Sequence, residues 1–172
     1  MKLLKKIGDV VTAVNDKIAK LASILIFPLV LVVVAEVFFR YILNHPTIYT
    51  YDLSWMLYAA FVFLGGGYAL HEEVHVKADI IYNMLKERGK AFINLFCYPV
   101  FFFTSMAGLL YSSYELMVKA WIHGETSPYT SWNPPVGPIK TVLFISILVL
   151  TLQGVVEFVK AMKHLRKGGN SK

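Results

Sequence analysis

Charged residues are scarce in this sequence of 172 residues, and cysteine is almost absent. Only 16% of the residues are charged and 56% are hydrophobic, whereas soluble domains average about 25% charged residues. Cys97 is the only cysteine, which excludes an internal disulfide and a cysteine-based metal site. The composition therefore excludes an ordinary soluble domain and a disordered chain, and it indicates an integral membrane protein.

The net charge is +6, from 17 Lys and Arg against 11 Asp and Glu. On a soluble protein such an excess would suggest a nucleic-acid partner. Here the basic residues lie between apolar runs, which is typical of the cytoplasmic side of membrane proteins. We therefore expect membrane lipids, and no nucleic acid, as partners of the basic segments.

Four apolar runs are long enough to cross a bilayer, because about 20 apolar residues in a helix span its hydrocarbon core. They lie at residues 21–39, 53–70, 91–118 and 139–159. The sequence thus predicts an all-α membrane protein in which residues 1–172 form a single membrane domain with four transmembrane helices.

The orientation follows from the distribution of lysine and arginine. Fourteen of these residues flank the runs on one side, and only Arg40, Lys119 and Lys140 lie on the other. Positively charged loops stay in the cytoplasm, so both termini and the middle loop are expected there. The three tryptophans lie at or beyond the outer ends of the runs, in agreement with the preference of tryptophan for the headgroup layer.

Residues 1–20 alternate between apolar and charged positions with helical spacing. Val10, Val14, Ile18 and Leu21 belong to the apolar stripe. This pattern predicts an amphipathic arm helix in the headgroup plane. The alternative is a cleaved signal peptide that ends at residues 33–35, but its charged leader and its apolar core would both be longer than usual.

Two carboxylates have a basic residue one helical turn away. Glu36 is followed by Arg40, and Glu115 by Lys119. Pairs at this spacing share a helix face and neutralise each other, so the simplest interpretation is a structural ion pair. Contact with a partner protein and a coupling carboxylate remain alternatives for Glu36, since ionisable groups within a membrane are often functional.

The sequence contains no arrangement typical of a cofactor site. None of the five histidines falls in the middle of an apolar run, which disfavours a haem held between two helices. His71 and His75 have a metal-compatible spacing but no third ligand nearby. We therefore expect neither a cofactor nor a metal, and the absence of a nucleophile–base constellation or a phosphate loop predicts that the chain is not an enzyme.

Small residues and prolines mark two possible contact surfaces. Thr104, Gly108 and Ser112 recur every four residues, a spacing that permits close helix approach. This stripe could pack within the bundle or against a larger membrane partner. The loop at 123–138 contains four prolines, which restrict its backbone, so it could cap the bundle or receive a soluble partner.

Several short motifs, in order along the chain, resemble one known family. They are Arg40 at the end of the first run, Asp52 at the start of the second, Gly65-Gly66-Gly67-Tyr68-Ala69-Leu70, His75-Val76-Lys77-Ala78-Asp79, Gly124-Glu125-Thr126-Ser127, Ile139-Lys140 and Leu152-Gln153-Gly154. Together they resemble the small membrane subunit (DctQ-like) of tripartite ATP-independent periplasmic, or TRAP, transporters. The later motifs are similar to those of the mannitol/chloroaromatic branch, which includes 2-oxo-acid and lactate systems.

The resemblance implies a small permease subunit in the bacterial inner membrane. In such sodium-coupled systems a periplasmic binding protein transiently delivers an organic acid, and a large membrane subunit binds substrate and sodium and moves as an elevator. The small subunit would form a heterodimer with the large one, extend its static scaffold and bind no substrate itself.

The candidate site residues are accordingly structural or interface residues. Glu36, Arg40 and Asp52 are expected to join the outer ends of the first two spans, and His75 and Asp79 to fix the inner loop or a subunit contact. Trp132 and Glu125 are candidates for contact with the binding protein. Further interface candidates are Gly108, Lys140 and Gln153.

Two other functions remain as alternatives. The first is an autonomous four-helix exporter that works as a homodimer and uses a membrane carboxylate as its proton site. The second is a cytochrome or quinone-anchor subunit, which the positions of the histidines disfavour.

Overall fold

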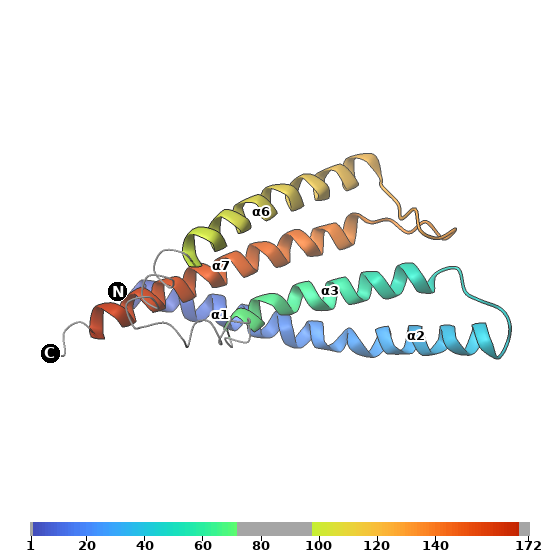
Figure 1. Ribbon diagram of the computed structural model, residues 1–172, viewed down its shortest axis with the longest axis horizontal. Coiled ribbons are helices and arrows are strands. Elements are labelled where there is room, and N and C mark those ends of the chain that lie inside the picture. Colours follow the sequence, from blue (N-terminus) through green and yellow to red (C-terminus); the bar gives the residue numbers. More distant parts are fainter. Residues whose placement is uncertain (1, 72–97, 169–172) are drawn as a thin grey trace.

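The structure is a computed structural model that describes residues 2–71 and 98–168 (Figure 1). The described residues form five α-helices and no strand, apart from one isolated bridge between Thr126 and Pro135. The helices are α1 (Lys2–Ile24), α2 (Ile26–Tyr41), α3 (Thr50–His71), α6 (Tyr98–His123) and α7 (Gly137–Gly168). The predicted all-α architecture is confirmed.

The helices form an elongated bundle with both described interhelical loops at one end (Figure 1). Helix α7 lies at its centre and packs on α3, α6 and α1, while α3 also packs on α1 and α2. Among the described helices, α6 has extensive contacts only with α7. The 42–49 and 124–136 connections lie at the end of the bundle opposite to the beginning of α1 (Figure 1).

Helices α1 and α2 are nearly continuous and are separated only by a turn at Leu25. Leu25 donates to the carbonyl of Ala22 (2.9 Å), as in a tightened last turn. Pro28 lies three residues further on and has no N–H to bond the carbonyl of Ile24, a usual cause of a helix break. The predicted boundary between the arm helix and the first span, after residue 20, thus falls inside α1.

One narrow stripe of α1 and α2 faces the rest of the bundle. Its residues are spaced by seven and all lie buried or half-buried: Gly8, Asn15, Ala22, Leu29 and Glu36. A seven-residue repeat keeps one side of a long helix against its neighbours. Of the apolar stripe predicted from the sequence, Val10, Val14 and Leu21 are exposed, whereas Ile18 is half-buried.

Three helical segments within the described residues are long and apolar enough to cross a membrane. They are Gly8–Tyr41, Thr50–Leu70 and Gly137–Val159. Helix α6 has sufficient length, with 26 residues, but serine, threonine, tyrosine and two charged residues lower its hydropathy. The predicted third span also begins at residue 91, and residues 91–97 lie outside the described part of the chain.

A buried amide pair joins α1 to α7. Asn15 and Gln153 are both fully buried, and Asn15 Nδ2 donates to Gln153 Oε1 at 2.8 Å. Gln153 Nε2 in turn donates to Glu157 Oε1 (2.9 Å) and to Thr12 Oγ1 (3.3 Å). An amide left without a partner among apolar helices is costly, so this network fixes the position of α1 along α7.

The same asparagine packs on a glycine of α3. A Cβ atom added to Gly67 would overlap the side-chain amide of Asn15. Asn15 Oδ1 accepts no conventional hydrogen bond from the described residues and lies against the Gly67 backbone, where a Cα–H group can approach an oxygen closely. Glycine at position 67 thus permits the close packing of α1, α3 and α7.

Gly67→Ala is expected to destabilise the fold by about 1–3 kcal/mol, the usual effect of overpacking, and to lower the thermal unfolding temperature in detergent. Gly65→Ala is the matched control, because a Cβ there meets no atom within 4 Å and alanine favours a helix by roughly 0.5–1 kcal/mol. Equal effects of the two substitutions on unfolding would contradict the proposed contact.

Candidate functional site: the loop end of the bundle

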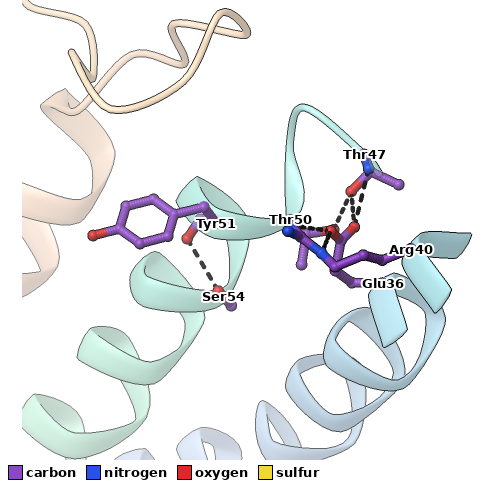
Figure 2. A network of polar contacts seen from close by, with 6 residues as sticks. All are labelled: Glu36, Arg40, Thr47, Thr50, Tyr51 and Ser54. Carbon is purple, nitrogen blue, oxygen red and sulfur yellow. Dashed lines mark hydrogen bonds and ion pairs between the residues drawn. The ribbon is translucent and has the colours of Figure 1, made fainter. Parts of the chain in front are cut away.

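The carboxylate of Glu36 joins α2 to the connection that leads into α3 (Figure 2). Arg40 Nε and Nη2 donate to its Oε1 at 2.9 and 2.5 Å. The backbone N–H of Thr47 (3.1 Å) and the Thr47 hydroxyl donate to its Oε2. Although Glu36 is only 8% exposed, both oxygens of its carboxylate are therefore neutralised and hydrogen-bonded.

The 42–49 connection is shaped to bring Thr47 back to Glu36. Ile42 and Leu43 both donate to the carbonyl of Phe38, and Asn44 adopts a positive φ of 52°, a conformation that asparagine tolerates better than most residues. The Thr47 hydroxyl lies 2.5 Å from that of Thr50, the first residue of α3. The end of α2 and the start of α3 are thus held together by one polar cluster.

Asp52 joins α3 to the second loop. Its side chain is fully buried and accepts hydrogen bonds from the hydroxyls of Ser127 and Thr130 and from Trp55 Nε1 at 3.0 Å. The sequence predicts that Asp52 acts together with Glu36 and Arg40, but its hydrogen-bond partners in the structure are other residues. Asp52 binds residues more than 70 positions further along the chain, whereas the Glu36 cluster is local.

Loop 124–136 begins with a helix C-cap that determines its direction. Gly124 has a φ of +58°, and the N–H of Glu125 donates to the carbonyl of Ala120 (3.0 Å), which is the bonding pattern of a Schellman motif. The loop then folds back on itself: Val136 donates to the carbonyl of Glu125 (3.0 Å), and Ser127 to that of Pro134 (2.9 Å).

An ion pair joins this loop to α7. Glu125 Oε2 accepts a hydrogen bond from Lys140 Nζ. This bond from Lys140 lowers the pKa of Glu125 below its ordinary value, against an opposing effect of desolvation. Glu125 is therefore ionised at neutral pH. Together with the Asp52 contacts, the pair holds the first half of the loop over the ends of α3 and α7.

Aromatic residues cover the outer surface of the two connections. Tyr49 and Trp132 make an edge-to-face contact with ring centroids 6.4 Å apart, and Tyr51 and Tyr129 make another at 5.8 Å. All four rings are more than 40% exposed. Since loop 124–136 is fixed by Asp52 and Lys140, these rings form a preformed surface, which we call the aromatic rim (Tyr49, Tyr51, Tyr129 and Trp132).

The remaining candidate residues are dispersed. Gly108 lies on an exposed face of α6 with Thr104 and Ser112, and a Cβ at Gly108 would meet no atom within 4 Å. Gln153 lies with Asn15 in the bundle core. His75 and Asp79 lie outside the described residues.

Apart from Arg40, sequence reasoning did not identify the hydrogen-bond partners of Glu36, Asp52 and Gln153. Asn15, Thr47 and Thr130 are not among the residues that the sequence marks, and Ser127 is marked only as part of a motif. Asn15 lies four residues after Val11 and three before Ile18 and so shares the face of both. A polar residue among apolar ones at that spacing is the signal that could have identified it. The partners of Asp52 have no such local signal.

The arrangement can hold a bundle together but offers little reactive chemistry. The carboxylates of Glu36 and Asp52 are occupied by hydrogen bonds from this chain. Within residues 2–71 and 98–168, no three histidine, cysteine or acidic side chains gather as a metal site would require. The loop end of the bundle therefore provides structural ties within the chain and an exposed aromatic surface.

Comparison with protein families agrees with this interpretation. The family model described as "Tripartite ATP-independent periplasmic transporters, DctQ component" matches residues 29–164, which is most of the chain. The chain belongs to the DctQ family. Searches of the curated proteins and of the solved structures found no match.

Membership in the DctQ family makes the chain the small permease component of a TRAP transporter and confirms the resemblance derived from the motifs. The match begins at residue 29 and so includes Glu36, Asp52, loop 124–136 and the Gln153 position, but not the α1 helix.

Asp52→Ala is expected to release loop 124–136, because three donors lose their acceptor and a hydrogen bond to a charged group contributes about 1.5–3 kcal/mol. Limited proteolysis should then cut the loop faster than in the wild type. Glu115→Gln is the matched control, since its partner Lys119 forms an exposed ion pair on α6. An unchanged cleavage rate in Asp52→Ala would contradict the role of this residue.

Proposed function

We propose that the chain is the static scaffold subunit of a sodium-coupled TRAP transporter that imports organic acids. On this proposal it forms a heterodimer with the large membrane subunit, contacts the periplasmic binding protein transiently, and binds no substrate itself. The observation that carries the proposal is that its membrane-embedded carboxylate, Glu36, is occupied by Arg40 and Thr47.

The exposed face of α6 supports a large membrane partner. Thr104, Gly108 and Ser112 lie on this face and make no close packing contact with the described helices. Helices associate in membranes mainly through close packing at such small residues. A stripe that is exposed among residues 2–71 and 98–168 is available for a helix of another chain.

The proposed topology has four spans, both termini in the cytoplasm and the loop end of the bundle in the periplasm of a bacterial inner membrane. Support comes from the distribution of lysine and arginine in the sequence and from the rim of exposed tyrosine and tryptophan, residues that favour the headgroup layer. In this topology α6 is the third span.

The aromatic rim is then the proposed contact for the binding protein. Two of its residues lie on a loop that is tied to α3 and α7, and protein interfaces are enriched in tyrosine and tryptophan. Trp132 belongs to the rim, whereas Glu125 is turned towards Lys140. The motifs similar to the mannitol/chloroaromatic branch favour 2-oxo or hydroxy acids as the transported class.

The alternative is an autonomous exporter with a proton-binding carboxylate. Such a site needs a carboxylate that releases and binds a proton in a cavity shared by two copies. The Glu36 carboxylate accepts four hydrogen bonds, two from Arg40 and two from Thr47 of the same chain, which disfavours this role.

Affinity purification of the full chain from its native membrane in mild detergent tests the proposal. We expect a larger, many-span membrane protein to co-purify in near one-to-one yield, and Gly108→Leu to reduce that yield severalfold because leucine blocks close approach. Ala35→Leu, at an exposed position on α2, is the control. Recovery of the chain only with itself, or sodium-driven acid uptake by the chain alone in liposomes, would contradict the scaffold function.

A further inference from the structure

A groove runs between α3 and α7 on the side where α6 stands apart. Its upper part is a cavity of about 370 Å³ beneath loop 124–136, lined by Trp55 and Phe63 of α3, Leu116 of α6 and Leu143 of α7. Within residues 2–71 and 98–168, helices α3 and α6 both pack on α7 but have no extensive contact with each other, so the space between them is open at the surface of this part of the chain.

The groove continues along the same two helices. A second cavity of about 350 Å³ shares Phe63 with the first and is lined further along by Gly66 and Ala69 of α3 and by Ile147 and Leu150 of α7. A Cβ at Gly66 would meet no atom within 4 Å. Both cavities have almost wholly apolar walls, and we call them together the α3/α7 groove.

The length of the groove along the helix axes matches the thickness of one leaflet of a bilayer. Lys140 lines its mouth and lies near the beginning of the candidate span Gly137–Val159. From Lys140 to Leu150 the helix rises by about 15 Å at ~1.5 Å per residue, which is half of the roughly 30 Å hydrocarbon core. The groove therefore extends from the headgroup boundary to about the middle of the membrane.

The mouth of the groove carries one charge of each sign. Glu125 and Lys140 form an ion pair whose side chains remain 35% and 23% exposed. The ammonium group has three N–H donors and gives one to Glu125 Oε2, while Glu125 Oε1 accepts no hydrogen bond from the described residues. A phosphate could accept from the lysine while a neighbouring ammonium donates to the free carboxylate oxygen.

We propose that the α3/α7 groove binds a phospholipid with a primary-amine headgroup. Its acyl chain lies along Phe63 and Gly66, its phosphate accepts from Lys140, and its ammonium donates to Glu125. A transmembrane helix of a partner is a poorer fit, because the groove stops at mid-depth and ends at a pair of opposite charges. This inference concerns the groove alone and does not rest on the proposed transport function.

Native mass spectrometry of the delipidated full chain tests the proposal. Phosphatidylethanolamine and phosphatidylglycerol with identical acyl chains are titrated separately, because the second has the phosphate but no amine. We expect one phosphatidylethanolamine to bind roughly tenfold more tightly than phosphatidylglycerol, the scale of one charge-assisted hydrogen bond.

Three variants separate the contacts. Glu125→Gln is expected to abolish the preference between the two lipids, and Lys140→Gln to weaken the binding of both. Gly66→Leu fills the groove and should weaken the binding of both lipids, while the preference for one lipid over the other stays the same. The substitution does not disturb the fold, because position 66 is open and leucine is a good helix former.

Two control variants make the same kinds of change, the loss of a cation and a gain in side-chain volume, at positions away from the groove. Lys119→Gln removes a cation from the exposed pair on α6, and Ala35→Leu enlarges an exposed residue of α2. Neither should change lipid binding. Equal affinity of the wild type for the two lipids, an unaltered affinity of Gly66→Leu, or an equal loss in either control would overturn the assignment.

Discussion

Hydrocarbon offers no hydrogen-bond partner, so a polar side chain within a membrane must find its partner in the protein itself. This constraint accounts for the main ties between the helices of this chain. Asn15 pairs with Gln153 to join α1 to α7. Glu36 accepts hydrogen bonds from Arg40 and Thr47 and so joins α2 to α3. Asp52 holds the second loop on α3. Apolar surface alone gives neighbouring helices little preference for one register in lipid. Such polar pairs therefore determine the position of each helix along its neighbour.

These ties leave the outward surfaces free for contact. The long α1–α2 segment uses a narrow seven-residue stripe for packing within the chain and turns its large apolar residues outwards. Helix α6 presents Gly108 in the same way. At the loop end, the Glu125–Lys140 pair and the Asp52 contacts fix the aromatic rim before any partner binds. A chain built in this manner suits the proposed scaffold function, because polar pairs join its helices and fix its second loop.

Features local in the sequence were predictable, and features that join distant segments were not. Apolar runs indicated the helices, and the four-residue spacing of Glu36 and Arg40 indicated a pair that the structure contains. The hydrogen bond between Asn15 and Gln153 links residues 138 positions apart, and no local pattern relates them. The arm illustrates the difference: its amphipathic pattern was evident, but the side that packs on the bundle proved to be the stripe of Gly8, Asn15 and Ala22, because small and polar residues allow the closest approach.

The proposed function requires that the Glu36 carboxylate holds structure and takes no part in coupling. The most direct test is transport by the complete system in proteoliposomes with Glu36→Gln in the small subunit, normalised to the amount of assembled transporter. The account predicts a lower yield of assembled transporter, since Arg40 loses its charged partner, with unchanged sodium and pH dependence of transport per complex. Full assembly together with a shifted sodium or pH dependence would contradict it.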